Sequence, residues 1–110
     1  SRSCGSFFTN PVLYKTEFNN FIKKAKIHNL NAPFFENENL FKIPAGWLIE
    51  NSGFKKGYKY KGVGISENHS LALVNYNGTT KDLLALASGI ENNVYEKFGL
   101  KLSKEPVIIP

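Results

Sequence analysis

The chain has 110 residues, of which 42% are hydrophobic, 14% aromatic and 21% charged. This length fits one domain with its own core, and the composition excludes a disordered, collagen-like or coiled-coil chain. No apolar run approaches the roughly 20 residues that a membrane span needs, and one cysteine cannot form an internal disulfide. We therefore expect a single globular domain without a disulfide framework.

The charge balance is basic, with 14 lysine and arginine residues against 9 acidic ones and a net charge of +5. Arg2 is the only arginine, so the two-pronged recognition of bases or phosphates that arginine provides is not indicated. A surface dominated by lysine suits an anionic small substrate or nucleic acid, and it also suits a protein that simply stays in solution.

The first third of the chain predicts one strand and one helix. A brief strand is expected at Phe7–Phe8, and Asn10-Pro11 ends it with a turn. Apolar residues at helical spacing predict a helix from about Thr16, its N-cap, to Lys26. The polar stretch Asn29–Asn39 is typical of an exposed connection.

The middle of the chain predicts a short helix between strands. Leu40–Ile43 alternates weakly like a strand, and Pro44 suits the first turn of a short helix over 45–52. Tyr58–Ile65, interrupted by glycines, fits one or two strands. The apolar run Leu71–Asn75 predicts a buried strand.

The clearest helix follows the Asn77-Gly78 turn. It begins at Thr79, which forms a capping box with Asp82, and it ends at Gly99. Gly89 inside this helix costs about 1 kcal/mol relative to alanine, which suggests close packing at that point. The last strand is expected from Leu102 onward, confined to a sheet edge by Pro106.

Helices and strands are mixed without a regular βαβ rhythm. We therefore predict an α+β fold with a single domain, in which a small mixed β-sheet packs against two main helices and one short helix.

Two residues are candidates for acid–base chemistry. Ser6 could present a hydroxyl at a strand end, although from the residues alone a polar residue of a strand start or turn is the simpler explanation. Glu105 stands among apolar residues, where partial burial would raise its pKa, or else it lies exposed at an edge. His28 and His69 have no cysteine or carboxylate at ligand spacing, so no metal site is predicted.

A lysine-rich stretch with two interleaved tyrosines is the feature most typical of nucleic-acid binding. Its members are Lys55, Lys56, Tyr58, Lys59, Tyr60 and Lys61. Such a stretch can follow a phosphate backbone and stack bases, but lysines also protect an edge strand from pairing with other sheets. The glycines nearby do not match a phosphate-binding loop.

Five motifs occur in one order along the chain: 5–11 (GSFFTNP), 43–50 (IPAGWLIE), 53–57 (GFKKG), 63–75 with Val63-Gly64-Ile65-Ser66, His69 and Leu71–Asn75, and 96–105 with Glu96–Leu100, Leu102 and Glu105. Together they resemble the C-terminal domain of the UDP-N-acetylenolpyruvoylglucosamine reductase family, also called UDP-N-acetylmuramate dehydrogenase. The resemblance covers nearly the whole chain, and the length between Pro11 and Ala45 resembles the longer of two family variants.

The resemblance implies a flavoenzyme of peptidoglycan synthesis in the bacterial cytoplasm. In this family, NADPH reduces FAD, and the flavin passes a hydride to the enolpyruvyl group of a UDP-sugar to give UDP-N-acetylmuramate. Residues 1–110 would be the C-terminal substrate-binding domain, and the FAD-binding domains are absent from this chain. We then expect the chain to be inactive alone, with the UDP-sugar and the missing domains as partners and neither nucleic acid nor a membrane.

The resemblance also implies roles for five residues. Ser6 falls on the family's proton donor, and Glu105 falls on a glutamate that polarises or helps to protonate the enolic intermediate. Asn10, Lys56 and His69 fall on positions that lie along the UDP moiety. No residue of this chain is expected to bind the cofactor or a metal.

Two other functions stay open at the level of the sequence. The first is a small basic nucleic-acid-binding module that uses the Lys55–Lys61 stretch, for which a steep salt dependence of oligonucleotide binding would be typical. The second is a structural domain that keeps the family's shape without binding substrate.

Overall fold

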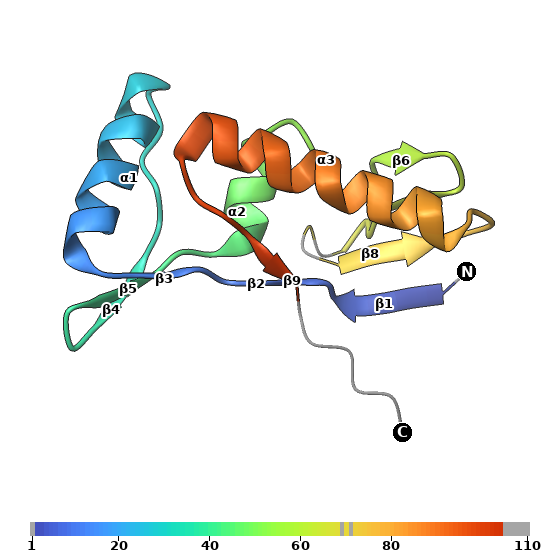
Figure 1. Ribbon diagram of the computed structural model, residues 1–110, viewed down its shortest axis with the longest axis horizontal. Helices are drawn as coiled ribbons and strands as arrows, with labels where there is room; N and C mark the ends of the chain where they lie inside the picture. Colours follow the sequence, from blue (N-terminus) through green and yellow to red (C-terminus); the bar gives the residue numbers. More distant parts are fainter. Residues whose placement is uncertain (1, 69, 71, 105–110) are drawn as a thin grey trace.

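The computed structural model describes residues 2–68, 70 and 72–104. Within them the chain forms three helices, α1 (Lys15–Ile27), α2 (Ala45–Glu50) and α3 (Thr80–Phe98), shown in Figure 1. The described strands are β1 (Arg2–Ser6), β2 (Phe8–Thr9), β3 (Val12–Leu13), β4 (Phe35–Asn37), β5 (Leu40–Lys42), β6 (Lys59–Tyr60), β7 (Val63–Ile65), β8 (Ala72–Asn75) and β9 (Ser103–Lys104). No helix among these residues has the length and apolar character needed to cross a membrane.

The α+β class with two long helices and one short helix is confirmed, but the strands do not form one mixed sheet. They form a four-stranded sheet in the order β1-β8-β7-β6, a three-stranded sheet in the order β3-β5-β4, and the pair β2-β9. All of these pairings are antiparallel. Two-residue turns at 38–39 and 61–62 join β4 to β5 and β6 to β7, and both residues of each turn have a positive φ. Such turns make antiparallel hairpins, whereas parallel strands need a long crossover connection.

Helix α3 packs along the four-stranded sheet and also contacts the other two helices. Its last residue, Phe98, joins them, with its ring 5.7 Å from that of Phe21 in α1 and 5.4 Å from that of Trp47 in α2. The core also contains almost fully buried side chains from all three helices and from strands β2, β7 and β8. They are Phe8, Phe21, Ile43, Leu48, Ile49, Val63, Ile65, Leu73, Ile90, Val94 and Phe98.

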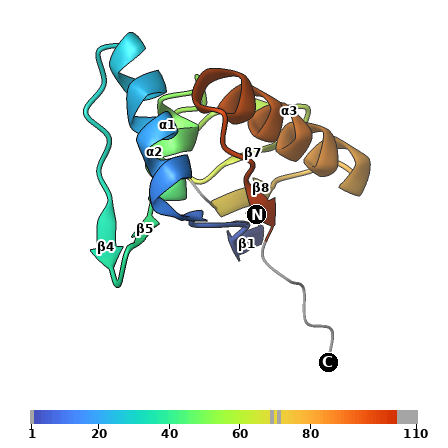
Figure 2. The same cartoon turned by 60° about the vertical axis from the view of Figure 1, so that its left-hand side comes forward.

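The three-stranded sheet packs against α1 at one end of the same core (Figure 2). The ring of Phe41 in β5 stacks on Phe18 of α1 at 4.0 Å, and Phe34 lies 4.7 Å from Phe18. Strand β4 lies inside the stretch predicted to be a connection. Its three residues are all exposed, so they lack the alternating pattern that identifies a strand in a sequence.

The helix boundaries follow their capping residues. In α3 the Thr79 hydroxyl accepts a hydrogen bond from the Asp82 amide at 3.0 Å, Asp82 accepts one from the Thr79 amide at 3.1 Å, and Gly99 ends the helix with φ of 71°. These hydrogen bonds from Thr79, with Lys61 and Lys81 nearby, hold the pKa of Asp82 below its ordinary value.

Helix α1 begins earlier than predicted. Its N-cap is Tyr14 rather than Thr16, because the Glu17 carboxylate accepts a hydrogen bond from the Tyr14 amide at 3.1 Å. The predicted last strand is described only at Ser103–Lys104, and its remaining residues from 105 onward lie outside the described residues.

Gly89 lies in a more open place than the sequence suggested. A Cβ atom added there would meet no described atom within 4 Å.

We predict that Gly89→Ala raises the free energy of unfolding by about 1 kcal/mol and the melting temperature by roughly 4–8 °C, measured by thermal and urea unfolding. Gly62→Ala is the contrasting variant, because Gly62 has φ of 81° and its added Cβ would lie 2.7 Å from the Gly78 amide nitrogen. A loss of stability in Gly89→Ala would contradict this prediction.

Candidate functional site around the start of α2

Ser6 is the last residue of β1, at the point where the chain changes sheets. Its backbone pairs with Ala72 of β8, and the register is irregular between Ser3 and Ser6. Two residues later the chain pairs with β9 instead. Such irregularities re-aim side chains and are common next to active sites.

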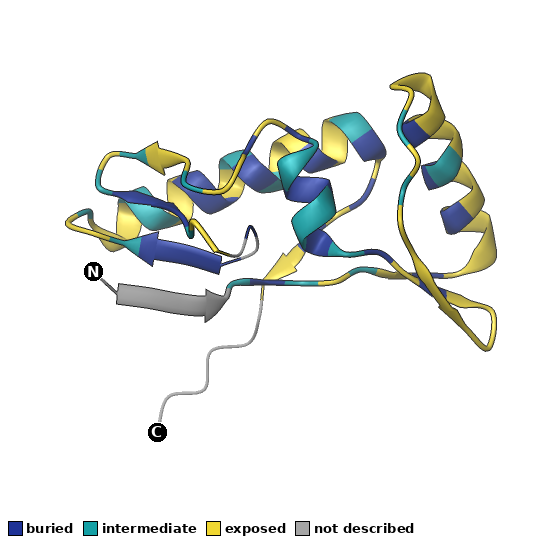
Figure 3. Ribbon diagram, turned by 180° about the vertical axis from the view of Figure 1, so that it is seen from behind, coloured by how far each residue is buried: buried dark blue, intermediate teal, exposed yellow. Residues whose placement is uncertain are grey.

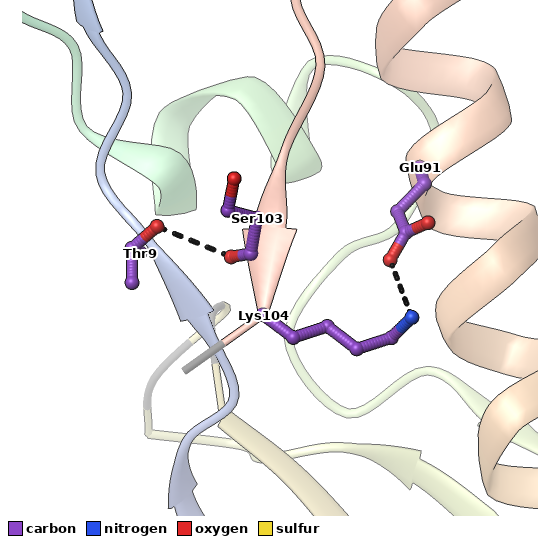
Figure 4. A network of polar contacts seen from close by, with 4 residues as sticks. All are labelled: Thr9, Glu91, Ser103 and Lys104. Carbon is purple, nitrogen blue, oxygen red and sulfur yellow. Dashed lines mark hydrogen bonds and ion pairs between the residues drawn. The ribbon is translucent and has the colours of Figure 1, made fainter. Parts of the chain in front are cut away.

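The pairing of β2 with β9 brings the end of the described chain close to its beginning. Phe8 pairs with Lys104 and Thr9 with Ser103. Figure 4 shows the Thr9 hydroxyl donating to the Ser103 carbonyl at 3.2 Å and the Lys104 ammonium 3.1 Å from the Glu91 carboxylate of α3. Glu105, the predicted partner of Ser6 in catalysis, follows Lys104 in the sequence and lies outside the described residues.

Asn10 holds the start of α2. Its side-chain oxygen accepts a hydrogen bond from the Ala45 backbone amide at 2.7 Å. The N-cap residue of this helix, Pro44, has no side-chain acceptor, so Asn10 satisfies an amide that the local sequence leaves unpaired. Asn10 is exposed, and within the described part of the chain its amide nitrogen has no hydrogen-bond partner.

The loop between β7 and β8 folds onto α2. Ser70 is buried, its hydroxyl donates to the Glu50 carboxylate, and a Cβ added at Gly46 would lie 3.5 Å from the Ser70 oxygen. The Asn68 amide donates to the Ser66 hydroxyl at 3.1 Å, which shapes the same loop. His69, a predicted substrate-binding residue, belongs to this segment but lies outside the described residues.

Lys56 is exposed in the turn before β6 and makes no ion pair with any other described residue. The amide of the next residue, Gly57, donates to the Ile65 carbonyl at 3.1 Å and to the Ser66 carbonyl at 3.3 Å. These bonds set the Lys56 turn against the first residues of the β7–β8 loop.

Of the other lysines of this stretch, Lys59 lies in β6 and Lys61 lies in the turn that follows it, so the edge strand that one interpretation of the sequence expected includes Lys59 alone. Strand β6 is at the end of the four-stranded sheet. The Lys59 ammonium lies 5.0 Å from the centre of the Tyr76 ring, and that of Lys61 lies 5.4 Å from the centre of the Tyr60 ring. Of the two tyrosines of the stretch, Tyr60 therefore has an ammonium group over its ring, while Tyr58 packs edge-on against Phe54 at 5.1 Å.

Backbone pairing and short contacts link three of the five predicted site residues to neighbouring segments of the domain. Ser6 is joined to the β7–β8 region through Ala72, Asn10 is joined to α2, and the turn of Lys56 adjoins the same loop. The Asn10 amide and the Lys56 ammonium are groups of the kind that suit an anionic, oxygen-rich ligand. Among the described residues no three histidine, cysteine, aspartate or glutamate side chains are grouped so as to hold a metal ion.

Residues 1–109 match a family of enzyme C-terminal domains, and this match defines the class of the α+β domain. The chain belongs to the family described as UDP-N-acetylenolpyruvoylglucosamine reductase, C-terminal domain. The resemblance predicted from the five motifs is therefore confirmed.

Three relatives named UDP-N-acetylenolpyruvoylglucosamine reductase illustrate the similarity. The chain is 46% identical to the protein of Thermobifida fusca over 99% of its own length, 43% identical to that of Streptomyces coelicolor over 97%, and 40% identical to that of Flavobacterium johnsoniae over 96%. It covers 32%, 29% and 30% of these relatives, respectively. The chain thus spans about a third of the length of the relatives it matches.

The bond from Asn10 to α2 yields a prediction about stability. Asn10→Ala removes the acceptor for the Ala45 amide and should cost about 1 kcal/mol of unfolding free energy, whereas Asn10→Asp keeps an acceptor and should cost much less. Urea unfolding of the two variants measures the difference. Equal losses in the two variants would show that the hydrogen bond does not hold the helix.

Proposed function

We propose that this chain is the substrate-binding domain of a UDP-N-acetylenolpyruvoylglucosamine reductase in the bacterial cytoplasm. The whole enzyme would reduce the enolpyruvyl group of UDP-N-acetylglucosamine-enolpyruvate to UDP-N-acetylmuramate for peptidoglycan synthesis. The observation that carries this proposal is the family match over residues 1–109, together with 46% identity to a protein of that name.

The flavin is assigned to the part of the enzyme outside this chain. The glycines between 57 and 64 do not fit a phosphate cradle, because they serve the β6–β7 hairpin: Gly62 lies in its turn, and a Cβ at Gly64 would lie 3.3 Å from the Lys59 Cα atom. FAD, reduced by NADPH and bound elsewhere in the same polypeptide, supplies the hydride.

The role proposed for Ser6 is to deliver a proton. Hydride addition to one carbon of the double bond moves the π electron pair to the carbon beside the carboxylate, which then takes a proton from the Ser6 hydroxyl, and water restores that proton. A serine is a weak acid, but the carbanion or enolate that it protonates is far more basic. Glu105 would polarise or help to protonate the same intermediate.

The ends of the described chain support this pairing of roles. The β2–β9 ladder sets Lys104 opposite Phe8, two positions from Ser6 and one position before Glu105. Buried residues on both sides of the ladder, Phe8 and Leu102, anchor it in the core. We propose that Ser6 and Glu105, from opposite ends of the sequence, act on the same substrate carbon.

The remaining site residues would bind the UDP part of the substrate. The Lys56 ammonium suits the diphosphate by charge, and a charge-assisted hydrogen bond to phosphate is stronger than a neutral one. The amide nitrogen of Asn10, whose oxygen already bonds Ala45, can donate to the same anionic group. His69 is assigned to the UDP moiety as well, on the family resemblance alone.

Ser6→Ala in the full-length enzyme tests the proton-donor role. We expect turnover to fall by about 10²–10⁴-fold, the contribution of a positioned general acid, while the dissociation constant for the UDP-sugar stays unchanged. Ser3→Ala, in the same strand, is the matched control and should keep full turnover. Normal turnover in Ser6→Ala would remove Ser6 from the mechanism.

Lys56→Gln tests the phosphate contact. We expect weaker binding of UDP-N-acetylglucosamine, measured by calorimetry, with a difference from the parent protein that shrinks as salt screens the charge. Lys55→Gln changes the neighbouring residue and the same net charge, and it should bind nearly normally. Equal weakening in both variants would point to a general effect of charge instead of a contact with Lys56.

A further inference from the structure

The three-stranded sheet has one face that nothing in the described structure covers. We call it the outer sheet face and define it by Val12, Tyr14, Phe35, Leu40 and Lys42. Val12, Lys42 and Phe35 form one row across β3, β5 and β4, because Val12 and Phe35 both pair with Lys42. Val12 is 53% exposed and Phe35 is 67% exposed, and Lys42 between them is exposed as well.

The opposite face of the same sheet is packed. Leu13 and Phe41 are buried, and the Phe41 ring stacks on Phe18 of α1. An antiparallel sheet with one covered face normally carries polar residues on the other. Here the bare face carries valine, phenylalanine and leucine beside Lys42 and Asn37, which pairs with Leu40. Figure 3 colours most of the β4–β5 hairpin as exposed. Exposed apolar side chains grouped on one sheet face, with polar residues among them, are typical of an interaction site.

The outer sheet face is continuous with the site described above. The Ile43 amide donates to the Pro11 carbonyl at 2.9 Å, which extends the β3–β5 ladder to the residue after Asn10. Asn10 in turn bonds Ala45 at the start of α2. A body that covers this face therefore lies next to Asn10, one of the predicted substrate-binding residues.

We infer that the outer sheet face docks against the part of the polypeptide that lies outside this chain. The inference rests on the proposed function, which requires a hydride donor from that part to reach a substrate held beside Asn10 and Ser6. The relatives have the necessary length, since the chain covers only 29–32% of them in the three cases compared. Because the two bodies are covalently linked, a modest apolar area suffices to keep them together.

The chemistry of the docking partner follows from the residues of the outer sheet face. The partner presents apolar side chains to Val12, Phe35 and Leu40. It also brings an anionic group to Lys42, because an ammonium that loses its water needs a partner of opposite charge.

Hydroxyl-radical footprinting of the full-length polypeptide, without substrate and read by mass spectrometry, tests the inference. Two tyrosines of this domain serve as probe and reference, since Tyr14 is 71% exposed and Tyr95 of α3 is 60% exposed in the chain. Docking predicts that Tyr14 is oxidised several-fold more slowly than Tyr95. The variant Phe35→Glu places a charge in the docked face at an exposed position, so it should raise the Tyr14 rate towards that of Tyr95, whereas Leu84→Glu on α3 should leave the Tyr14 rate unchanged.

Two results would overturn the inference. One is a Tyr14 rate that matches or exceeds the Tyr95 rate in the parent polypeptide. The other is protection of Tyr14 that disappears on dilution, since the occupant would then be a second copy of the molecule. Footprinting needs no catalysis, so a protected Tyr14 in a polypeptide that does not reduce the enolpyruvyl substrate would support docking and reject the proposed function alone.

Discussion

The pairing of β2 with β9 is the constraint on which the rest of the structure depends. It joins residues 94 positions apart, one before the first helix and one after the last, and so closes the domain around its core. The Lys104–Glu91 ion pair beside it is partly exposed, and a single ion pair that solvent still reaches contributes little. The ladder is held mainly by Phe8 and Leu102, because burying each side chain contributes about 1.5–3 kcal/mol.

The site uses residues that also hold the fold together. The side-chain oxygen of Asn10 fixes the start of α2, which leaves its nitrogen for a ligand. Ser70 and Glu50 fix the β7–β8 loop against the same helix, and Gly57 fixes the turn that carries Lys56. Because each segment is fixed by a contact of its own, the proposed substrate groups are presented by a framework that exists before substrate binds.

Local signals in the sequence predicted the elements that depend on local chemistry. The capping box of Thr79 and Asp82 and the left-handed Gly99 define α3 from neighbouring residues alone, and the five motifs identified the family. The sequence did not predict β4, since an exposed strand carries no alternating pattern. It also gave no sign that Gly89 faces open space, which depends on what packs beside the helix.

Contacts between distant residues could not be predicted from the sequence. Asn10 and Ala45 are 35 positions apart and Ser70 and Glu50 are 20 apart, and no spacing rule connects either pair. The strand order of the sheets could not be predicted either, because it depends on pairings between the two halves of the chain as well as on the two tight hairpins. The sequence named Asn10 as a ligand residue without revealing that its oxygen is already engaged.

A double-mutant cycle on the full-length enzyme tests most directly whether the two ends of this chain act on one reacting carbon. The rate of the substrate-reducing step would be measured by anaerobic stopped-flow for Ser6→Ala, Glu105→Gln and the double variant. Residues that act as a unit have strongly non-additive effects, so we predict that the double variant is hardly slower than Ser6→Ala alone. If the two losses multiply, Ser6 and Glu105 act independently, which contradicts the proposal that they act on one reacting carbon.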